Sequence, residues 1–95
     1  MASWEQSTLL TPLMGQIVVV DLKSPFVGLG TLVSCDELFL ELEDADLHDF
    51  RDSTATREVY VYDSVRLGIR RNRARVLIRL EDVIALTRFA DIVES

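Results

Sequence analysis

Five short stretches of this chain alternate apolar with polar residues or carry apolar residues on both sides. They cover residues 16–23, 26–34, 38–43, 75–80 and 83–88. β-Branched and aliphatic residues dominate these stretches, which suits the pleated surface of a sheet. We therefore predict five strands. The core predicted from their alternation consists of Val18, Val20, Leu22, Leu32, Leu40, Leu42, Ile78 and Val83.

The last two stretches, RVLIRL and VIALTR, are separated only by the acidic pair Glu81–Asp82. Residues 83–88 carry apolar side chains on both faces. Such strands usually lie inside a barrel or between subunits. We predict that copies of the chain pair through these strands, head to tail, and close into a ring, a cyclic homo-oligomer. The predicted interface residues are Val76, Ile78, Val83, Ile84, Ala85 and Leu86.

Gly28 and Gly30 lie two residues apart inside the second predicted strand. Glycines at this spacing favour the sharp bend that a small barrel needs. No further glycine or Gly-Lys-Ser/Thr pattern accompanies them, so they do not form a phosphate-binding loop. The pattern predicts an all-β fold: a small, strongly bent, five-stranded barrel.

The rest of the chain predicts one short helix and a variable insertion. Ser3 and Gln6 have the spacing of a capping box, which favours a helix over about 3–10 that ends before Pro12. Residues 45–56 form a polar connection. Residues 57–67 are predicted to be extended, with Val59 and Val61 on one side and Tyr60 and Tyr62 on the other. We expect one domain, 1–95, with a variable insertion at about 45–74.

Composition excludes several classes of protein. An apolar fraction of 48% is too high for a disordered chain. No apolar run approaches the roughly 20 residues of a membrane-spanning helix, and the N-terminus lacks a secretory signal. The single cysteine, Cys35, cannot form an internal disulfide and is expected to be a small buried residue at a strand end. These observations predict a cytoplasmic protein without a membrane partner.

Candidate catalytic chemistry is sparse. His48 is the only histidine, and we interpret it as a solvated loop residue that completes no catalytic dyad. The acidic residues near it lack the spacing of a calcium loop and are interpreted as a solvated acidic loop: Glu43, Asp44, Asp46, Asp49 and Asp52. We expect no enzymatic activity, no metal and no cofactor.

Charge is distributed unevenly along the chain. Residues 1–65 hold 3 basic and 12 acidic side chains, a net −9, whereas residues 66–95 hold 7 and 4, a net +3. An acidic protein is a poor general nucleic-acid binder, and we expect no DNA partner. The local arginines are candidates either for RNA phosphates or for the acidic loop of a neighbouring subunit: Arg70, Arg71, Arg73 and Arg75.

The order of these elements resembles the Sm-like (LSm) family. The first sequence block of that family is similar to Leu13-Met14-Gly15, Val18-x-Val20-x-Leu22-Lys23, Gly30-x-Leu32, Asp36 and Leu40-x-Leu42-x-x-Ala45. The second block is similar to Ile78-Arg79-Leu80-Glu81-Asp82-Val83-x-x-Leu86. The resemblance implies an SH3-like barrel, a ring and contact with RNA, in a divergent member of bacterial type.

The resemblance also implies a base pocket that is altered in this chain. Arg79 matches the family's arginine, but Leu40, or Phe39 in a register one residue shorter, stands where the family has asparagine. Leu80 replaces a glycine, and Glu37 or Leu38 occupies the stacking position. We therefore predict weak RNA binding with little base selectivity at Arg79, Phe39 and Leu40. The alternative is an oligomeric scaffold or protein-interaction module that does not bind RNA.

Overall fold

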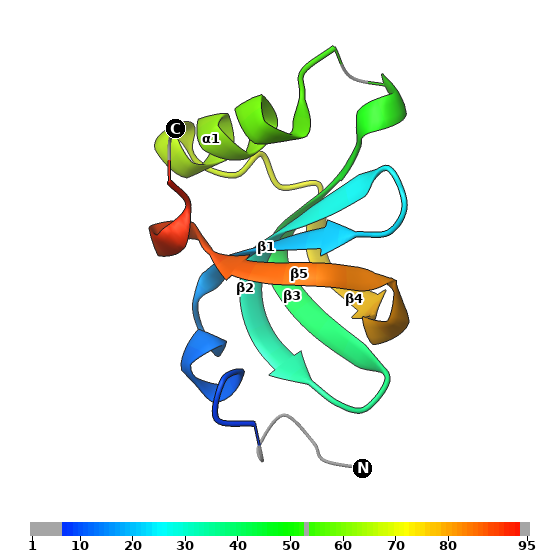
Figure 1. The fold of residues 1–95 in the computed structure, drawn as a ribbon, viewed down its shortest axis with the longest axis vertical. Helices are drawn as coiled ribbons and strands as arrows, with labels where there is room; N and C mark the ends of the chain where they lie inside the picture. Colours follow the sequence, from blue (N-terminus) through cyan, green and yellow to red (C-terminus); the bar gives the residue numbers. More distant parts are fainter. Residues whose placement is uncertain (1–6, 53, 94–95) are drawn as a thin grey trace.

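The computed structural model describes residues 7–52 and 54–93. Its five strands are β1 (Ile17–Leu22), β2 (Phe26–Cys35), β3 (Phe39–Asp49), β4 (Arg73–Arg79) and β5 (Val83–Arg88). One α-helix, α1 (Arg57–Leu67), connects β3 to β4. Figure 1 shows the strands as a curved sheet, with α1 and the C-terminal segment together on one side of it.

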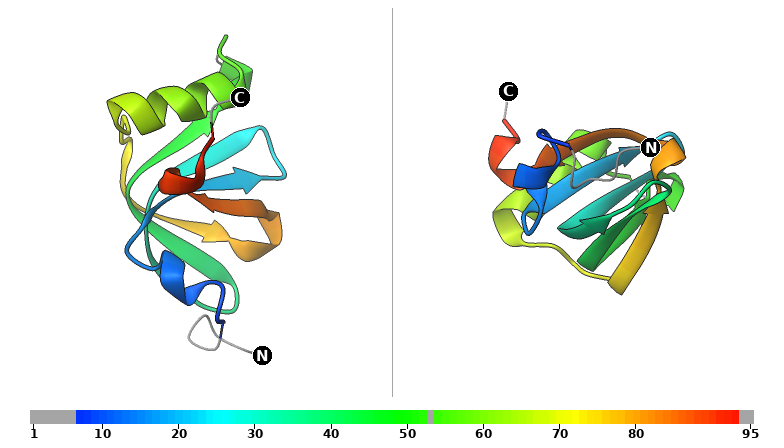
Figure 2. Two further views of the ribbon diagram at one scale, coloured as in Figure 1. Left: turned by 60° about the vertical axis from the view of Figure 1, so that its left-hand side comes forward. Right: turned by 90° about the horizontal axis from the view of Figure 1, so that it is seen from below.

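All strand pairs are antiparallel, in the order β4-β3-β2-β1-β5. β4 and β5 are consecutive in the chain and are joined by a single 3-10 turn, η4 (Leu80–Asp82), yet they form opposite edges of the sheet. The sheet must therefore curl so that its two edge strands approach at one end, as the view from below illustrates (Figure 2). The five-stranded, strongly bent sheet predicted from the sequence is confirmed.

The concave face of the sheet encloses the main core. Seven of the eight predicted core residues are buried, and the eighth, Val83, is half-buried and packs against them. We call this cluster the inner core; its buried members are Val18, Val20, Leu22, Leu32, Cys35, Leu40, Leu42, Ala45 and Ile78. Cys35 is buried at the end of β2, as expected, and burial raises the pKa of its thiol.

The two glycines of β2 allow neighbouring strands to approach closely. A Cβ atom on Gly28 would lie 2.9 Å from the Cδ1 atom of Ile78. A Cβ atom on Gly30 would lie 3.0 Å from the backbone oxygen of Glu43 and 3.1 Å from Ala45. The register between β2 and β3 shifts around Gly30. Gly30 therefore stands where the backbone of β3 comes too close for a side chain, and Gly28 leaves space for the end of the Ile78 side chain.

The prediction of an extended segment at 57–67 is wrong, because these residues form α1. Thr56 caps the helix by accepting a hydrogen bond from the N–H of Val59 (3.2 Å). Gly68, with φ of 99°, ends it, and its N–H donates to the oxygen of Ser64 (2.9 Å). The face of α1 that packs on the sheet carries Tyr60, Val61 and, one turn later, Val65.

α1 builds a second core on the convex face of the sheet. We call it the outer core; its buried members are Val19, Val27, Leu29 and Val61. Phe50, Tyr60, Val65, Ile69, Phe89 and Ile92 pack against it. Of the four alternating residues 59–62, only Tyr60 and Val61 contribute to this core, and Val59 is 50% exposed, because consecutive residues point in different directions around a helix.

Two further predictions about local structure are wrong. The N-terminal part of the predicted helix at 3–10 lies outside the described residues, while residues 8–10 form turns that lead into a 3-10 helix, η2 (Thr11–Leu13). Pro12 therefore lies within helical turns. Residues 45–49, predicted as a polar connection, continue β3. In the described part of the chain, no helix is long and apolar enough to cross a membrane.

Candidate functional site

The turn between β2 and β3 and the turn between β4 and β5 meet at one end of the sheet. The N–H of Leu80 donates to the oxygen of Leu38 across the two turns (2.8 Å). The carboxylate of Asp36 accepts hydrogen bonds from the N–H groups of Leu38 and Phe39, both at 2.8 Å. These two backbone donors lower the pKa of Asp36. The arrangement brings together the turns that carry the predicted base pocket.

Arg79 lies at this junction, but its charge is already compensated. Its guanidinium forms ion pairs with Asp82 (2.9 Å) and Glu81 (3.1 Å). The hydrogen bond to Asp82 raises the pKa of Arg79. The Arg79 side chain is 60% exposed.

Leu40 and Phe39 lie in very different places. Leu40 is 2% exposed and is part of the inner core, opposite Ile78 of β4. Phe39 is half-buried and pairs in register with Arg79. It lines a pocket of about 200 Å³ together with Ser34, Asp36, Leu40, Glu41, Arg75 and Leu77. Of the two residues that the resemblance sets at the asparagine position, Leu40 is thus a core residue and Phe39 is half-buried, and neither side chain has a polar group.

The remaining predicted arginines lie at the opposite end of β4. Arg71 forms an ion pair with Asp44, and Arg75 forms one with Glu41, both within the same chain. Arg73 donates to the backbone oxygen of Asn72 (3.1 Å), and Arg70 forms no ion pair within the described residues. The structure thus places Arg70, Arg71 and Arg73 at the far end of β4 from Arg79, and two of the four arginines, Arg71 and Arg75, are compensated by carboxylates of the same chain.

The predicted interface residues divide into two groups. Ile78 is buried in the inner core, and the side chains of Val76, Val83 and Leu86 pack against it. Ile84 and Ala85 are exposed on β5, Ile84 at 63%. In the described residues no strand pairs with the outer edge of β4 or of β5. Both strands therefore offer unpaired backbone groups, and only β5 adds exposed apolar side chains from this set.

His48 and Asp46 were predicted to be solvated loop residues, and that prediction is wrong. His48 lies on β3, with its ring stacked on Tyr60 (centroids 3.9 Å apart, 14° between planes) and edge-on to Phe50. Its Nε2 atom is buried without a hydrogen-bond partner. Asp46 is 4% exposed beneath α1, and desolvation raises its pKa despite the attraction of His48 and Arg73. No group of metal-ligating residues occurs among 7–52 and 54–93.

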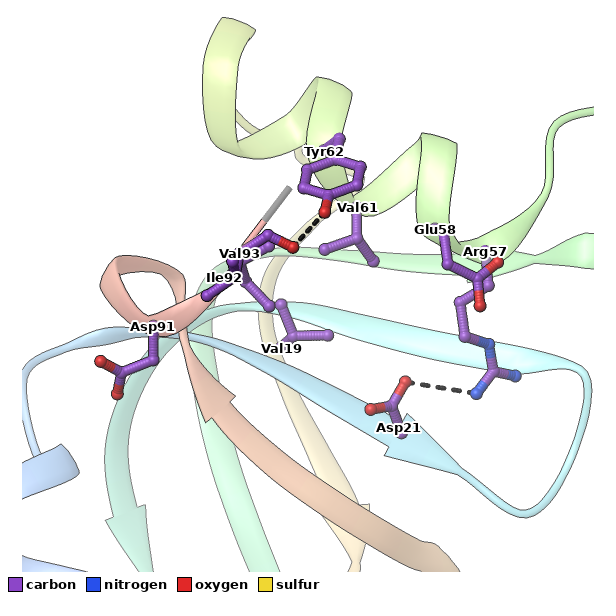
Figure 3. A pocket seen from close by; sticks show the side chains of 9 residues that line it. All are labelled: Val19, Asp21, Arg57, Glu58, Val61, Tyr62, Asp91, Ile92 and Val93. Carbon is purple, nitrogen blue, oxygen red and sulfur yellow. Dashed lines mark hydrogen bonds and ion pairs between the residues drawn. The ribbon is translucent and has the colours of Figure 1, made fainter. Parts of the chain in front are cut away.

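A pocket that the sequence did not reveal lies between α1, β1 and the C-terminal segment (Figure 3). Its volume is about 320 Å³, and its lining residues are Val19, Asp21, Arg57, Glu58, Val61, Tyr62, Asp91, Ile92 and Val93. Arg57 donates to Asp21 across the gap between α1 and β1 (3.2 Å). The Tyr62 hydroxyl donates to the backbone oxygen of Val93. Because 57–67 was predicted as a strand, no sequence signal placed these residues together.

Comparison with known proteins gives one informative result. No protein-family model and no curated protein sequence matches the chain. Among solved structures it is similar to an Sm protein of Pyrococcus abyssii, which was determined in complex with a uridine heptamer. The sequences are 21% identical, the TM-score is 0.58, and the match covers 84% of this chain and 92% of that chain. The chain therefore has an Sm-like fold, as the sequence blocks predicted.

Proposed function

We propose that this chain is an Sm-like protein that assembles with copies of itself into a ring. The observation that carries the proposal is the pair of open sheet edges: β4 and β5 each pair with a neighbour on one side only. Open edges present rows of unsatisfied N–H and C=O groups, and natural proteins cover or pair them. Pairing β4 of one copy with β5 of the next satisfies both edges and produces a closed, head-to-tail assembly.

The side chains of β5 support the same arrangement. Ile84 is bulky and exposed, and it contributes nothing to the inner core of its own chain. Ala85 next to it is small, so it leaves room for an approaching strand. Val76 and Ile78, which were predicted as interface residues, face the inner core, and we infer that they shape β4 for pairing without contacting the next copy.

RNA association is the second candidate function. The Sm protein of similar fold was determined with a uridine heptamer, and Arg79 of this chain lies at the junction of the two turns. Two carboxylates compensate Arg79, and Leu40 offers no hydrogen bond to a base. Arg70 and Arg73, at the start of β4, are exposed and form no ion pair among the described residues, although Arg73 attracts the buried carboxylate of Asp46. We therefore expect RNA to be bound weakly, through phosphates and with little base selectivity.

An oligomeric scaffold without RNA is the alternative to this second candidate. The intrachain pairs of Arg71, Arg75 and Arg79 favour it, because each of them removes a cation from phosphate recognition. Both readings share the assembled ring. A cytoplasmic location, a bacterial-type origin and the absence of catalysis remain predictions from the sequence.

The assembly proposal is tested by two matched substitutions of exposed apolar residues. Ile84→Lys places a charge at the β5 edge, whereas Leu67→Lys places the same charge at the end of α1, where the side chain is equally free of core contacts. Light scattering should show dissociation for Ile84→Lys and the wild-type mass for Leu67→Lys, with unchanged circular dichroism for both. Ala85→Pro, which removes a strand donor, should act like Ile84→Lys. Equal masses for all variants would refute edge pairing.

RNA association is tested by a salt titration with single-stranded oligouridine and oligoadenosine of equal length. Weak phosphate binding predicts similar affinities for both and a steep loss of affinity with salt. Replacing Arg70 and Arg73 with glutamine should weaken binding to both sequences and flatten the salt slope. Arg66→Gln is the control, because Arg66 already forms an ion pair with Asp63 (3.9 Å). Absence of binding at low salt would favour the scaffold.

A further inference from the structure

The pocket under α1 has the composition of a ligand site. Its floor is apolar, formed by Val19 and Val61, which are buried, and by Ile92. Its volume of about 320 Å³ is at the lower end of the range for small-molecule pockets, which begins at roughly 300 Å³. Figure 3 shows the Tyr62 ring above this floor and the carboxylates of Asp21 and Asp91 at its two sides. A ligand with an apolar stem on this floor and a polar group at the rim would fill the pocket.

Charge at the rim decides which polar group fits. The lining contains three carboxylates, of Asp21, Glu58 and Asp91, and one guanidinium, of Arg57, which gives a net charge of −2. Arg57 pairs with Asp21. Arg88, which lies outside the lining, pairs with Asp91 at 2.8 Å and lowers its pKa. Glu58 forms no ion pair in the described part of the chain.

Tyr62 adds a second preference for positive charge. Its hydroxyl is held by the backbone oxygen of Val93, which fixes the ring at the mouth of the pocket. The face of an aromatic ring attracts a cation, most strongly where water is partly excluded. Glu58 lies about one turn before Tyr62 on α1, and a carboxylate and an aromatic face that line the same pocket favour an ammonium group over an anion.

We propose that this pocket binds an organic cation: an ammonium group on an aliphatic stem, with the stem on Val19, Val61 and Ile92 and the charge beside Glu58 and Tyr62. The source of the group is either a free amine or a lysine side chain of a partner peptide. Among the described residues, none from β4 or β5 lines the pocket. The proposal is therefore independent of ring assembly and of RNA binding.

Three probes with the same stem and different charge test the proposal: hexylamine, hexanol and hexanoate, titrated at neutral pH into the assembled protein. Methyl resonances of Val19, Val61 and Ile92 report occupancy, and those of the inner core serve as a reference. Hexylamine should bind at least about 5-fold more tightly than hexanol, which corresponds to about 1 kcal/mol. Hexanoate should bind most weakly, and added salt should reduce the preference for the amine.

Glu58→Gln removes the unpaired carboxylate at an exposed position, so the fold should persist. It should lower the affinity for hexylamine about 2–5-fold and leave that for hexanol unchanged. Glu37→Gln, an equal change of charge at the far turn, should alter neither. Repeating the titration with acetyl-lysyl-amide distinguishes a peptide lysine from a free alkylamine. Equal binding of amine and alcohol, or shifts confined to other methyl groups, would overturn the proposal.

Discussion

The two faces of the sheet bury different chemistry. The inner core contains only aliphatic side chains and one cysteine, and it fills the curl of the sheet. The outer core is smaller and lies between the sheet and α1, and the same face also buries the carboxylate of Asp46 and the imidazole Nε2 atom of His48. The inner core is therefore the main source of stability. The outer face combines moderate apolar burial with polar groups that cost stability when they lack partners.

This difference indicates separate roles for the two layers. The curl around the inner core places β4 and β5 at opposite edges, which is the geometry required for assembly. α1 and the C-terminal segment add a cover to the convex face and form the pocket in Figure 3. A change in the inner core should thus affect folding and assembly together, whereas a change in the outer layer should affect mainly the docking of α1.

The largest effect is expected in the inner core. Leu42 is fully buried between β2 and β4, and Leu42→Ala would leave a cavity. Truncation of a buried leucine typically costs about 2–5 kcal/mol. Chemical denaturation should show a loss of this size in the free energy of unfolding. A loss below about 1 kcal/mol would mean that the inner core is not the main source of stability.

Val61→Ala tests the outer core with a comparable truncation. Val61 is buried beneath α1, and the substitution removes two methyl groups, worth about 1–2 kcal/mol. Hydrogen exchange should accelerate in α1 while β1, β2 and β3 keep their protection. If all strands lost protection to the same extent as α1, the two layers would unfold as one unit and the distinction between them would fail.

Thr56→Ala tests the stability of α1 without changing a residue of either core. The hydroxyl of Thr56 accepts from the N–H of Val59, and loss of such a cap costs about 1 kcal/mol. A smaller decrease in melting temperature than for Val61→Ala is expected. Thr56→Ser, which keeps the acceptor, should restore most of the stability, and its failure to do so would exclude capping as the cause.

Asp46→Asn should have the smallest effect, and with the opposite sign. Burial raises the pKa of Asp46 above its unfolded value. The ionised form is therefore disfavoured in the fold, and the resulting penalty appears as pH rises through the folded pKa. The variant should be more stable than the wild type near pH 7, by less than about 1 kcal/mol because attraction to His48 and Arg73 is also lost. The difference should vanish below the unfolded pKa.

Thermal melts of the wild type and of Asp46→Asn between pH 3 and pH 8 measure this difference in stability. Other carboxyl groups titrate in the same window: hydrogen bonds and ion pairs lower the pKa of Asp36, Asp49 and Asp91, so their stabilisation is lost on acidification. These groups are common to both proteins and cancel in the comparison. A variant less stable than the wild type at neutral pH would show that the ionised Asp46 is stabilising.

The inner face was largely predictable from the sequence, because strand alternation reports burial directly where one face is apolar. The outer face was not. β3 alternates regularly up to Glu43, but Asp44 adopts a positive φ of 49°, and Leu42 and Ala45 then both face the inner core. A shift of one residue exchanges the faces of everything that follows. The sequence pattern therefore predicted that Asp46 and His48 are loop residues, although they lie on β3 and face α1.

α1 was missed for a related reason. Val59, Tyr60, Val61 and Tyr62 alternate as strand residues do, and the prediction followed this local pattern in place of the helix signals at both ends. Thr56 before the segment and Gly68 after it mark the limits of an 11-residue helix. The roles of the residues in the predicted base pocket depend on contacts that no spacing contains, such as the pairing of Arg79 with Glu81 and Asp82.

The mass of the native protein in solution tests the central claim most directly. The chain has a mass of 10.8 kDa. Light scattering during size exclusion, over a range of micromolar concentrations, should give a single species at a whole-number multiple of this mass, and native mass spectrometry should give the same number of copies. A species of 10.8 kDa that persists at the highest concentration, with open edges on both strands, would contradict the account.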